Sequence, residues 1–167
     1  MKKLLKNIVA ILILFSLFML LLISTSKNVY EFSIVDGDTV KNSHSYFRAI
    51  YIDTPELKEQ KEWVKNIINN ESCLSYYGKK AKEFITSKAQ DFYVFYSEFF
   101  KDRYGRFLAE FNYYNGTSLE LDMVRNGLAL CYYRNAVFYL PKTYECLKIE
   151  QVAKNRNIGL WSCIKQG

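Results

Sequence analysis

The sequence predicts an α+β fold of the OB-fold type, a five-stranded Greek-key β-barrel with three helices, preceded by an N-terminal hydrophobic leader. Short segments rich in β-branched and aromatic residues are separated by turn residues, and later segments repeat apolar residues at helical spacing. The resulting order of three strands, a helix, two strands and two helices is the order that such a barrel with capping helices produces. The 167 residues, half of them hydrophobic, suffice for one domain with one core.

The leader comprises residues 1–26, and the domain comprises residues 27–167. Three lysines precede an apolar run at residues 8–23, which is the pattern of an export signal. The 16 residues of this run are fewer than the roughly 20 of a membrane span and more than the about 7 to 15 of a signal-peptide core. Two interpretations therefore stay open, a signal peptide cleaved close to Ser26 and a retained membrane anchor. Both predict a domain outside the cytoplasm, secreted or attached to the outer face of the membrane.

Composition adds a mild basic bias. The formal net charge of the chain is +6, and removing the three leader lysines leaves +3 for the domain. This bias is compatible with a phosphate-bearing partner but is too weak to establish one. Aromatic residues make up 17% of the chain, which argues against disorder over most of its length.

Three short strands begin the domain, at residues 30–35, 39–41 and 46–52. Their β-branched and aromatic residues, separated by two turns, predict a meander. We expect Asp36-Gly37 to form the first turn, with the glycine at a positive φ. His44, the single histidine, lies in the second turn, and we assign it no role.

A polar and charged segment follows at residues 57–76, and it predicts a long surface loop with some helical content around residues 61–68. Apolar residues at helical spacing then predict an amphipathic helix over residues 77–89. Aromatic residues indicate two strands at residues 91–99 and 106–114, joined by a turn that ends in glycine.

Two helices complete the domain. Thr117-Ser118-Leu119-Glu120 has the spacing of a capping box, which predicts the start of a helix. Gly127 either ends this helix or lies just before its end. Pro141 suits the first position of the last helix, which Gly159 stops. We expect Trp161 in the tail to dock against the body of the domain.

The four cysteines are Cys73, Cys131, Cys146 and Cys163. An even number in an exported domain suggests disulfides, and a bond between Cys73 and Cys163 would fix the long loop to the tail. Three connectivities are possible, and four free buried thiols are also possible.

The stretch from Asp36 to Glu56 gathers charge within this apolar region. If its two turns lie at the same end of the sheet, Asp38, Asp53 and Glu56 converge. Two carboxylates and a main-chain carbonyl are hard oxygen ligands, which suit Ca²⁺ better than Zn²⁺.

Four motifs, in this order, resemble the staphylococcal-nuclease-like (thermonuclease) family. They are Val35-Asp36-Gly37-Asp38-Thr39-Val40, Arg48 five residues ahead of Asp53-Thr54-Pro55-Glu56, Asp102-Arg103-Tyr104-Gly105-Arg106, and Val124-Arg125-Asn126-Gly127-Leu128-Ala129. The resemblance extends from about Tyr30 to Ser162. It implies a Ca²⁺-dependent phosphodiesterase on an OB-fold that cuts DNA and RNA and leaves 3′-phosphates.

The resemblance also implies a role for each matching residue. The metal ligands are Asp38, Asp53 and the main-chain carbonyl of Thr54. Glu56 matches the glutamate that orients or deprotonates the attacking water.

The remaining matches concern the substrate. Arg48 and Arg106 match the arginines that grip the scissile phosphate, and Tyr104 and Tyr133 match tyrosines that contact the substrate. We expect these side chains at a surface cleft, in a monomer, so that replacing either arginine leaves the fold intact.

Two alternatives belong to other functional classes. One is a non-catalytic OB-fold surface protein that binds single-stranded nucleic acid through aromatic strand faces. The other is a structural surface domain without a nucleic-acid role. The combination of three carboxylates with two arginines favours the nuclease, because a binding protein has no use for carboxylates that face phosphate unless a cation lies between them.

Overall fold

Strands of the computed structural model, which describes residues 2–132 and 140–164, form two sheets. One sheet has the order β1-β6-β7-β4-β3-β2, and the other pairs β5 with β8. The strands are β1 (Ser26–Val29), β2 (Ser33–Ile34), β3 (Thr39–Lys41), β4 (Tyr46–Ala49), β5 (Ile52–Asp53), β6 (Phe92–Lys101), β7 (Phe107–Tyr113) and β8 (Leu130–Cys131). The helices are α1 (Lys2–Ser24), α2 (Glu62–Lys65), α3 (Glu71–Ser87), α4 (Leu119–Arg125), α5 (Leu140–Asn155) and the 3₁₀ helix η2 (Gly159–Cys163).

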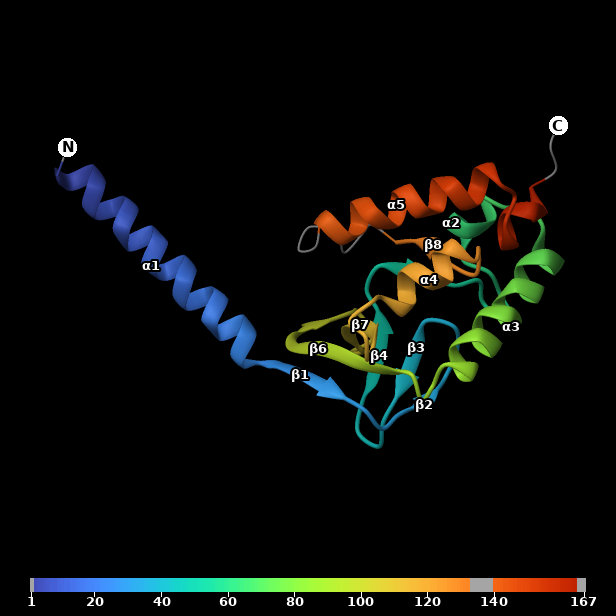
Figure 1. Cartoon of the computed structure of the whole chain (residues 1–167), viewed down its shortest axis with the longest axis horizontal. Coiled ribbons are helices and arrows are strands. Elements are labelled where there is room, and N and C mark those ends of the chain that lie inside the picture. The colour runs from blue at the N-terminus through green and yellow to red at the C-terminus, as the bar shows by residue number, and fades with distance from the viewer. Residues whose placement is uncertain (1, 133–139, 165–167) are drawn as a thin grey trace.

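The larger sheet curls into a half-barrel, which confirms the predicted fold class (Figure 1). Its strands pair antiparallel except for β4 and β7, which run parallel, and the register of β6 on β7 shifts between Tyr96 and Lys101. The number of strands differs from the prediction. An additional strand, β1, pairs with β6, and the strand predicted at residues 46–52 is divided into β4 and β5.

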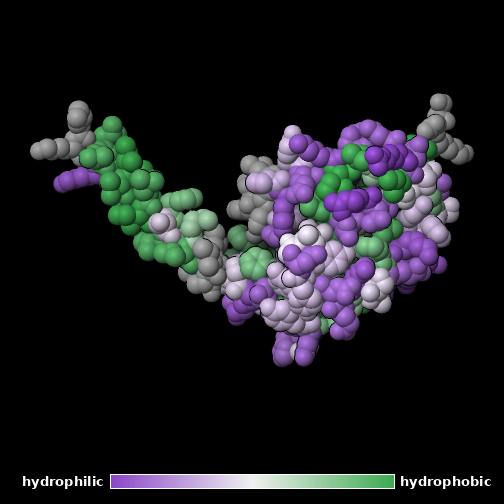
Figure 2. Space-filling view, in the orientation of Figure 1, coloured by the Kyte–Doolittle hydropathy of each residue, from purple (hydrophilic) through white to green (hydrophobic). Residues whose placement is uncertain are grey.

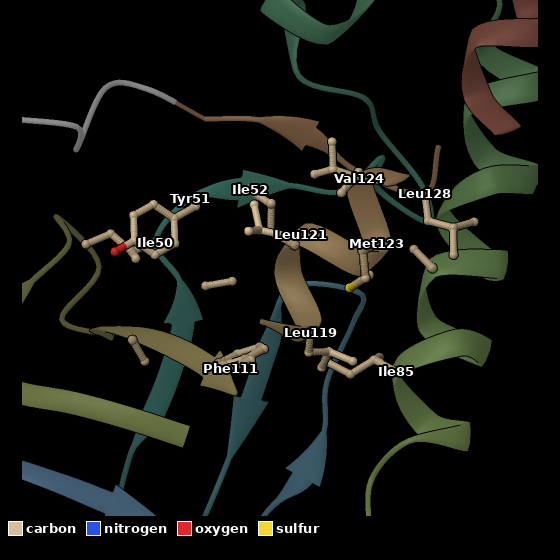
Figure 3. Packing of buried hydrophobic residues seen from close by; sticks show 14 of the residues in the cluster. Ile50, Tyr51, Ile52, Ile85, Phe111, Leu119, Leu121, Met123, Val124 and Leu128 are labelled. Carbon is tan, nitrogen blue, oxygen red and sulfur yellow. The ribbon is translucent and has the colours of Figure 1, made fainter. Parts of the chain in front are cut away.

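Buried side chains fill the space between the sheet, α3 and α4. Figure 3 shows Ile85 of α3, Leu119 and Met123 of α4, and Phe111 of β7 converging there, and all four are fully buried. A second cluster lies under η2, and it contains Val64, Ile68, Leu74, Leu130 and Trp161. The docking predicted for Trp161 is therefore confirmed, since its side chain is buried in this cluster.

About half of the segment predicted as a loop at residues 57–76 is helical. The helix α2 falls within the region where helical content was expected, but α3 begins at Glu71 and not at Tyr77. The side chain of Asn70 accepts a hydrogen bond from the N–H of Cys73, so this residue caps α3 and does not interrupt it.

The capping box predicted at Thr117 is wrong by one residue. Ser118 is the N-cap of α4, and its hydroxyl accepts a hydrogen bond from the N–H of Leu121. Glu120 does not reach back to the helix start, because its carboxylate is buried in the core. Pro141 is the second residue of α5.

Both cysteine pairs form disulfides in the structure, Cys73 with Cys163 and Cys131 with Cys146. The first bond joins α3 to η2, as the pairing suggested from the sequence would do. The second joins β8 to α5. Because β8 pairs with β5, this second bond fixes the strand that lies beside Asp53.

The helix α1 projects away from the rest of the molecule, and its surface is apolar (Figures 1 and 2). Among the residues that the structure describes, no helix combines the length and the apolar character that crossing a membrane requires.

Candidate active site

The turn between β2 and β3 places Asp38 at the start of a strand. The N–H groups of Val35 and Asp36 both donate to the carbonyl of Thr39, and Asp36 Oδ1 accepts from the N–H of Asp38 at 3.1 Å. Gly37 is not among the glycines of positive φ, so the reason expected for this glycine is wrong. A Cβ at Gly37 would lie 2.8 Å from side-chain atoms of Ala81 and Thr54, so glycine is needed for close packing.

Arg48 of β4 joins the two predicted metal-ligand carboxylates. Its Nη2 lies 2.6 Å from Asp53 Oδ1 and 3.1 Å from Asp38 Oδ2. Its Nη1 donates to the carbonyls of Ala49 and Ile52, both at 2.7 Å, so the guanidinium fills the bend between β4 and β5. Arg48 is only 6% exposed, which corrects the expectation of a surface cleft at this residue.

Asp38 accepts hydrogen bonds from both sides of the site. The N–H and hydroxyl of Thr54 donate to Oδ2 at 2.8 and 3.2 Å, and the hydroxyl of Thr39 donates to Oδ1 at 3.0 Å. Burial alone would raise the pKa of Asp38, but the charges of Arg48 and Lys61 and these hydrogen bonds hold it below its usual range. Asp38 is therefore an ionised carboxylate at neutral pH.

The pKa values of the two neighbouring aspartates, Asp36 and Asp53, are raised and not lowered. Burial and the negative charge of Asp38 raise the pKa of Asp36 to about 6. Burial also raises the pKa of Asp53 to about 6, with Asp38 adding to the effect while Arg48 opposes it. For Asp36 and Asp53, burial is thus the largest cause of the raised pKa, and the charge of Asp38 adds to it.

Glu56 lies at the rim of the site, with its side chain 37% exposed. The side chain of Gln60 holds the main chain of Glu56 at two points, accepting from its N–H at 2.9 Å and donating to its carbonyl. On the other side, a Cβ at Gly78 of α3 would lie 2.6 Å from the carbonyl oxygen of Pro55, so glycine is required there for the helix to approach. The backbone at Glu56 is thus fixed while its carboxylate faces outward.

Lys61 bridges the rim and the interior. Its Nζ lies 2.5 Å from Asp53 Oδ1 and 2.8 Å from Glu56 Oε1. Burial would lower the pKa of Lys61, but the charges of Asp53 and Asp38 raise it instead, so the ammonium stays protonated.

Arg106 reaches the same cluster from the hairpin between β6 and β7. Its Nε donates to Asp102 Oδ2 at 2.7 Å, and its Nη1 donates to the Thr39 hydroxyl at 3.3 Å, the same hydroxyl that donates to Asp38. Tyr104 is 68% exposed, and the guanidinium carbons of Arg106 and Arg103 lie 5.5 and 4.8 Å from the centre of its ring. Tyr133 lies outside the described residues.

The sequence alone did not identify several residues of the site. Lys61 and Gln60 stand in a polar segment with no spacing that distinguishes them from their neighbours. Arg103 stands inside a quoted motif and was not singled out. Tyr132, whose ring centre is 6.0 Å from Arg48 Cζ, was considered only together with Tyr133.

The donor atoms of the site fit a hard cation. Carboxylate oxygens of Asp38 and Asp53 converge on one guanidinium nitrogen, and those of Asp53 and Glu56 converge on one ammonium. Oxygen donors of this kind suit Ca²⁺, whereas the thiolates that Zn²⁺ favours are absent because all four cysteines are in disulfides. In the described part of the chain, no group of three or more His, Cys, Asp or Glu is arranged to hold a metal by side chains alone. The fit therefore depends on a main-chain carbonyl and water in addition to the two aspartates.

Comparison with known proteins identifies a family and a related protein. Residues 46–163 match the model of the family described as staphylococcal nuclease homologue. The uncharacterized protein MJ1439 of Methanocaldococcus jannaschii is 32% identical over 146 residues, which cover 77% of this chain and 69% of that protein. The family match includes Arg48, Asp53, Glu56 and Arg106 and begins after Asp38.

Behind the site, Glu120 is a fully buried carboxyl. Its Oε1 accepts from the N–H of Phe111 at 3.0 Å and its Oε2 from that of Tyr51 at 3.4 Å. Burial and the charge of Glu110 raise the pKa of Glu120 to about 8. The carboxyl is therefore protonated in the folded protein at neutral pH and ionised in the unfolded chain.

The two arginines should differ in their effect on stability. We expect Arg48→Ala to lower the free energy of unfolding by about 3 to 5 kcal/mol, because it leaves two buried carboxylates without their shared partner. Arg106→Ala should cost only about 1 kcal/mol, since its ion pair with Asp102 is partly exposed. Urea denaturation followed by circular dichroism measures both values. Equal losses in the two variants would contradict the structural role of Arg48.

Glu120 should make stability fall with rising pH. The folded protein retains a proton that the unfolded chain releases near its ordinary pKa of 4.5, so stability is lost as the pH rises from about 5 through 8. At about 1.4 kcal/mol per pKa unit, the loss amounts to a few kcal/mol. Glu120→Gln cannot ionise, and its stability should approach or exceed that of the wild type as the pH rises.

Urea denaturation at several pH values tests this expectation, with Glu145→Gln on the exposed surface of α5 as the matched control. The control should follow the wild type at every pH. A difference between Glu120→Gln and the wild type that does not change between pH 5 and 8.5 would exclude the proposed titration.

Proposed function

The chain belongs to the staphylococcal nuclease homologue family, and from this premise we propose that it is a Ca²⁺-dependent nuclease that hydrolyses DNA and RNA and leaves 3′-phosphate ends. The main support is the convergence of three carboxylates from two separate turns, Asp38, Asp53 and Glu56, around shared cations, with Arg48 among them. Arg106 joins the same cluster through one threonine hydroxyl. A binding module has no need for such a concentration of ionised groups.

Asp38 and Asp53, with the main-chain carbonyl of Thr54, would hold the Ca²⁺ ion. When bound, the ion supplies electrostatic stabilisation of the negative charge that develops on the phosphate oxygens. The protein places both carboxylates in advance, since hydrogen bonds from Thr39 and Thr54 fix the orientation of Asp38.

Glu56 is the group that would position the attacking water and accept its proton. The carboxylate of Glu56 is the most exposed of the three, so solvent can reach it. Gln60 holds the main chain of Glu56, so the side chain starts from a fixed backbone position. A carboxylate at the rim can release the proton to solvent after the reaction.

The arginines would stabilise the transition state. The guanidinium of Arg106 is oriented by Asp102, and that of Arg48 is fixed by two main-chain carbonyls. Donors that are already oriented need no reorganisation when charge develops on the phosphate. Both Nη atoms of Arg48 are already bound to two carbonyls and two carboxylates, so Arg48 would contribute its positive charge, whereas Arg106 would donate to the phosphate. A lysine at position 106 would lack the planar pair of donors.

We also propose that the protein is exported and works outside the cytoplasm as a monomer, either free or attached to the membrane through residues 8–23. The basic and apolar leader supports export. Two disulfides are consistent with an oxidising compartment.

Cleavage of DNA at saturating Ca²⁺ tests the nuclease proposal. The wild type should cut DNA and should stop when a chelator is added, and Mg²⁺ should support a lower rate because it requires a tighter octahedron. Arg106→Ala should lose at least about a hundredfold in rate, as for the loss of one oriented donor. Glu56→Gln should also lose rate while it still binds Ca²⁺, measured by calorimetry.

Arg125→Ala is the matched control, because Arg125 lies on the surface of α4 and pairs with Asp122. It should cut as fast as the wild type. If Arg106→Ala and the wild type cut equally fast, the assigned role of Arg106 is wrong. Binding of nucleic acid without cleavage in any divalent ion would instead identify a non-catalytic OB-fold binder.

Mass spectrometry of the protein recovered outside the cytoplasm, alkylated without reductant, tests export. We expect a new N-terminus close to Ser26 and no alkylated cysteine. An intact N-terminus in the membrane fraction would indicate a retained anchor. Recovery only in the cytoplasm, with four alkylated cysteines, would contradict export and the disulfides.

A further inference from the structure

Lys61 occupies a position that its local structure does not explain. It is the N-cap residue of α2, where Ser, Thr, Asp or Asn is preferred because such side chains accept a hydrogen bond from the helix. Its side chain makes no capping hydrogen bond to α2. Instead the ammonium extends to Asp53 and Glu56, at 2.5 and 2.8 Å. The lysine therefore serves the carboxylate cluster and not the helix.

Among the residues that the structure describes, Arg48 and Lys61 contact the carboxylates of Asp38, Asp53 and Glu56, and they differ in burial. Arg48 is buried and held by two main-chain carbonyls in addition to its carboxylates. The side chain of Lys61 is 37% exposed, and its ammonium contacts the carboxylates of Asp53 and Glu56. A lysine side chain on four flexible carbons can move into solvent without disturbing the backbone.

We propose that Lys61 is a tethered counter-cation which the divalent ion must displace, so that Lys61 sets the affinity of the site for its metal. The inference rests on the proposed function, in which Asp53 is a metal ligand. Asp53 Oδ1 already contacts both Arg48 Nη2 and Lys61 Nζ. A divalent cation on this carboxylate would meet the ammonium at a few ångströms in a partly buried environment, where repulsion between like charges is strong.

Around Glu56, only the side chain of Lys61 needs to move when the metal displaces its ammonium. Gln60 holds the main chain of Glu56 independently of Lys61, so Glu56 keeps its place when the ammonium leaves. Metal binds only the fraction of molecules in which the ammonium has left, and the apparent dissociation constant rises in proportion. Removing the ammonium should therefore strengthen metal binding and leave the ligand carboxylates in place.

Calorimetric titration of the metal-free full chain with Ca²⁺ tests this inference. Lys61→Met keeps the length of the side chain and removes its charge, and it should bind Ca²⁺ roughly tenfold more tightly or better, as expected for a site freed of a competing state. Lys58→Met is the matched control, because Lys58 is exposed in the same segment and carries the same charge. Its affinity should stay within about twofold to threefold of the wild type, since exposed charges are screened by salt.

A second measurement separates displacement from general electrostatics. Without metal, Lys61→Met should melt at a lower temperature than the wild type, because two carboxylates lose their counter-cation, and Ca²⁺ should raise its melting temperature by more. Lys61→Arg retains the charge and should resemble the wild type in both experiments, which also covers the case in which the methionine variant does not fold.

The outcomes distinguish this inference from the proposed function. If the wild type binds Ca²⁺ and Lys61→Met binds it no more tightly than Lys58→Met does, Lys61 is not a counter-cation and the nuclease proposal stands. If Lys61→Met binds Ca²⁺ and the wild type does not, the inference is supported. If neither protein binds Ca²⁺, the inference and the metal dependence are both wrong.

Discussion

The guanidinium of Arg48 connects the fold to the candidate site, because it contacts both the strand backbone and the site carboxylates. It links Asp38, which directly precedes β3, to Asp53, which ends β5, and its Nη1 binds the carbonyls at the bend between β4 and β5. Burying three charges is costly unless each is paired and hydrogen-bonded. The pairing of both carboxylates with one guanidinium therefore stabilises the observed arrangement of these strands. Formation of the site is thus coupled to the packing of the strands.

A second constraint comes from α3, which packs against both turns of the site. Gly37 and Gly78 leave room for this helix and for the backbone at Pro55, and side chains there would overlap with neighbouring atoms. The helix also contributes Ile85 to the core, so the same element that fills the core fixes the distance between the turns. Turns that pack against a helix in this way keep their geometry better than unsupported loops.

The sequence predicted which carboxylates lie close together better than it predicted their environment. Local spacing was sufficient to identify Asp38, Asp53 and Glu56, since the turns that carry them are encoded within a few residues. Burial of Arg48 depends on how β4 bends into β5, and the contacts of Lys61 depend on the path of residues 57–61; neither is encoded locally. Tertiary packing also changed the start of α3, because Asn70 caps a helix that continues through polar residues held against the core by Leu74.

Two cations next to the carboxylates have a consequence for the protein without metal. Asp38 and Asp53 both have a counter-charge in this structure, so the ligand geometry can form without a divalent ion, in contrast to small metal-binding domains that fold only with their metal. The two cations would therefore have different roles, Arg48 in stability and Lys61 in metal affinity. Arg48 compensates the buried charge permanently, whereas Lys61 compensates it from the rim, where solvent can take its place. Under the proposed function, the site would be preorganised for a cation, and its affinity would be limited by the charge of Lys61.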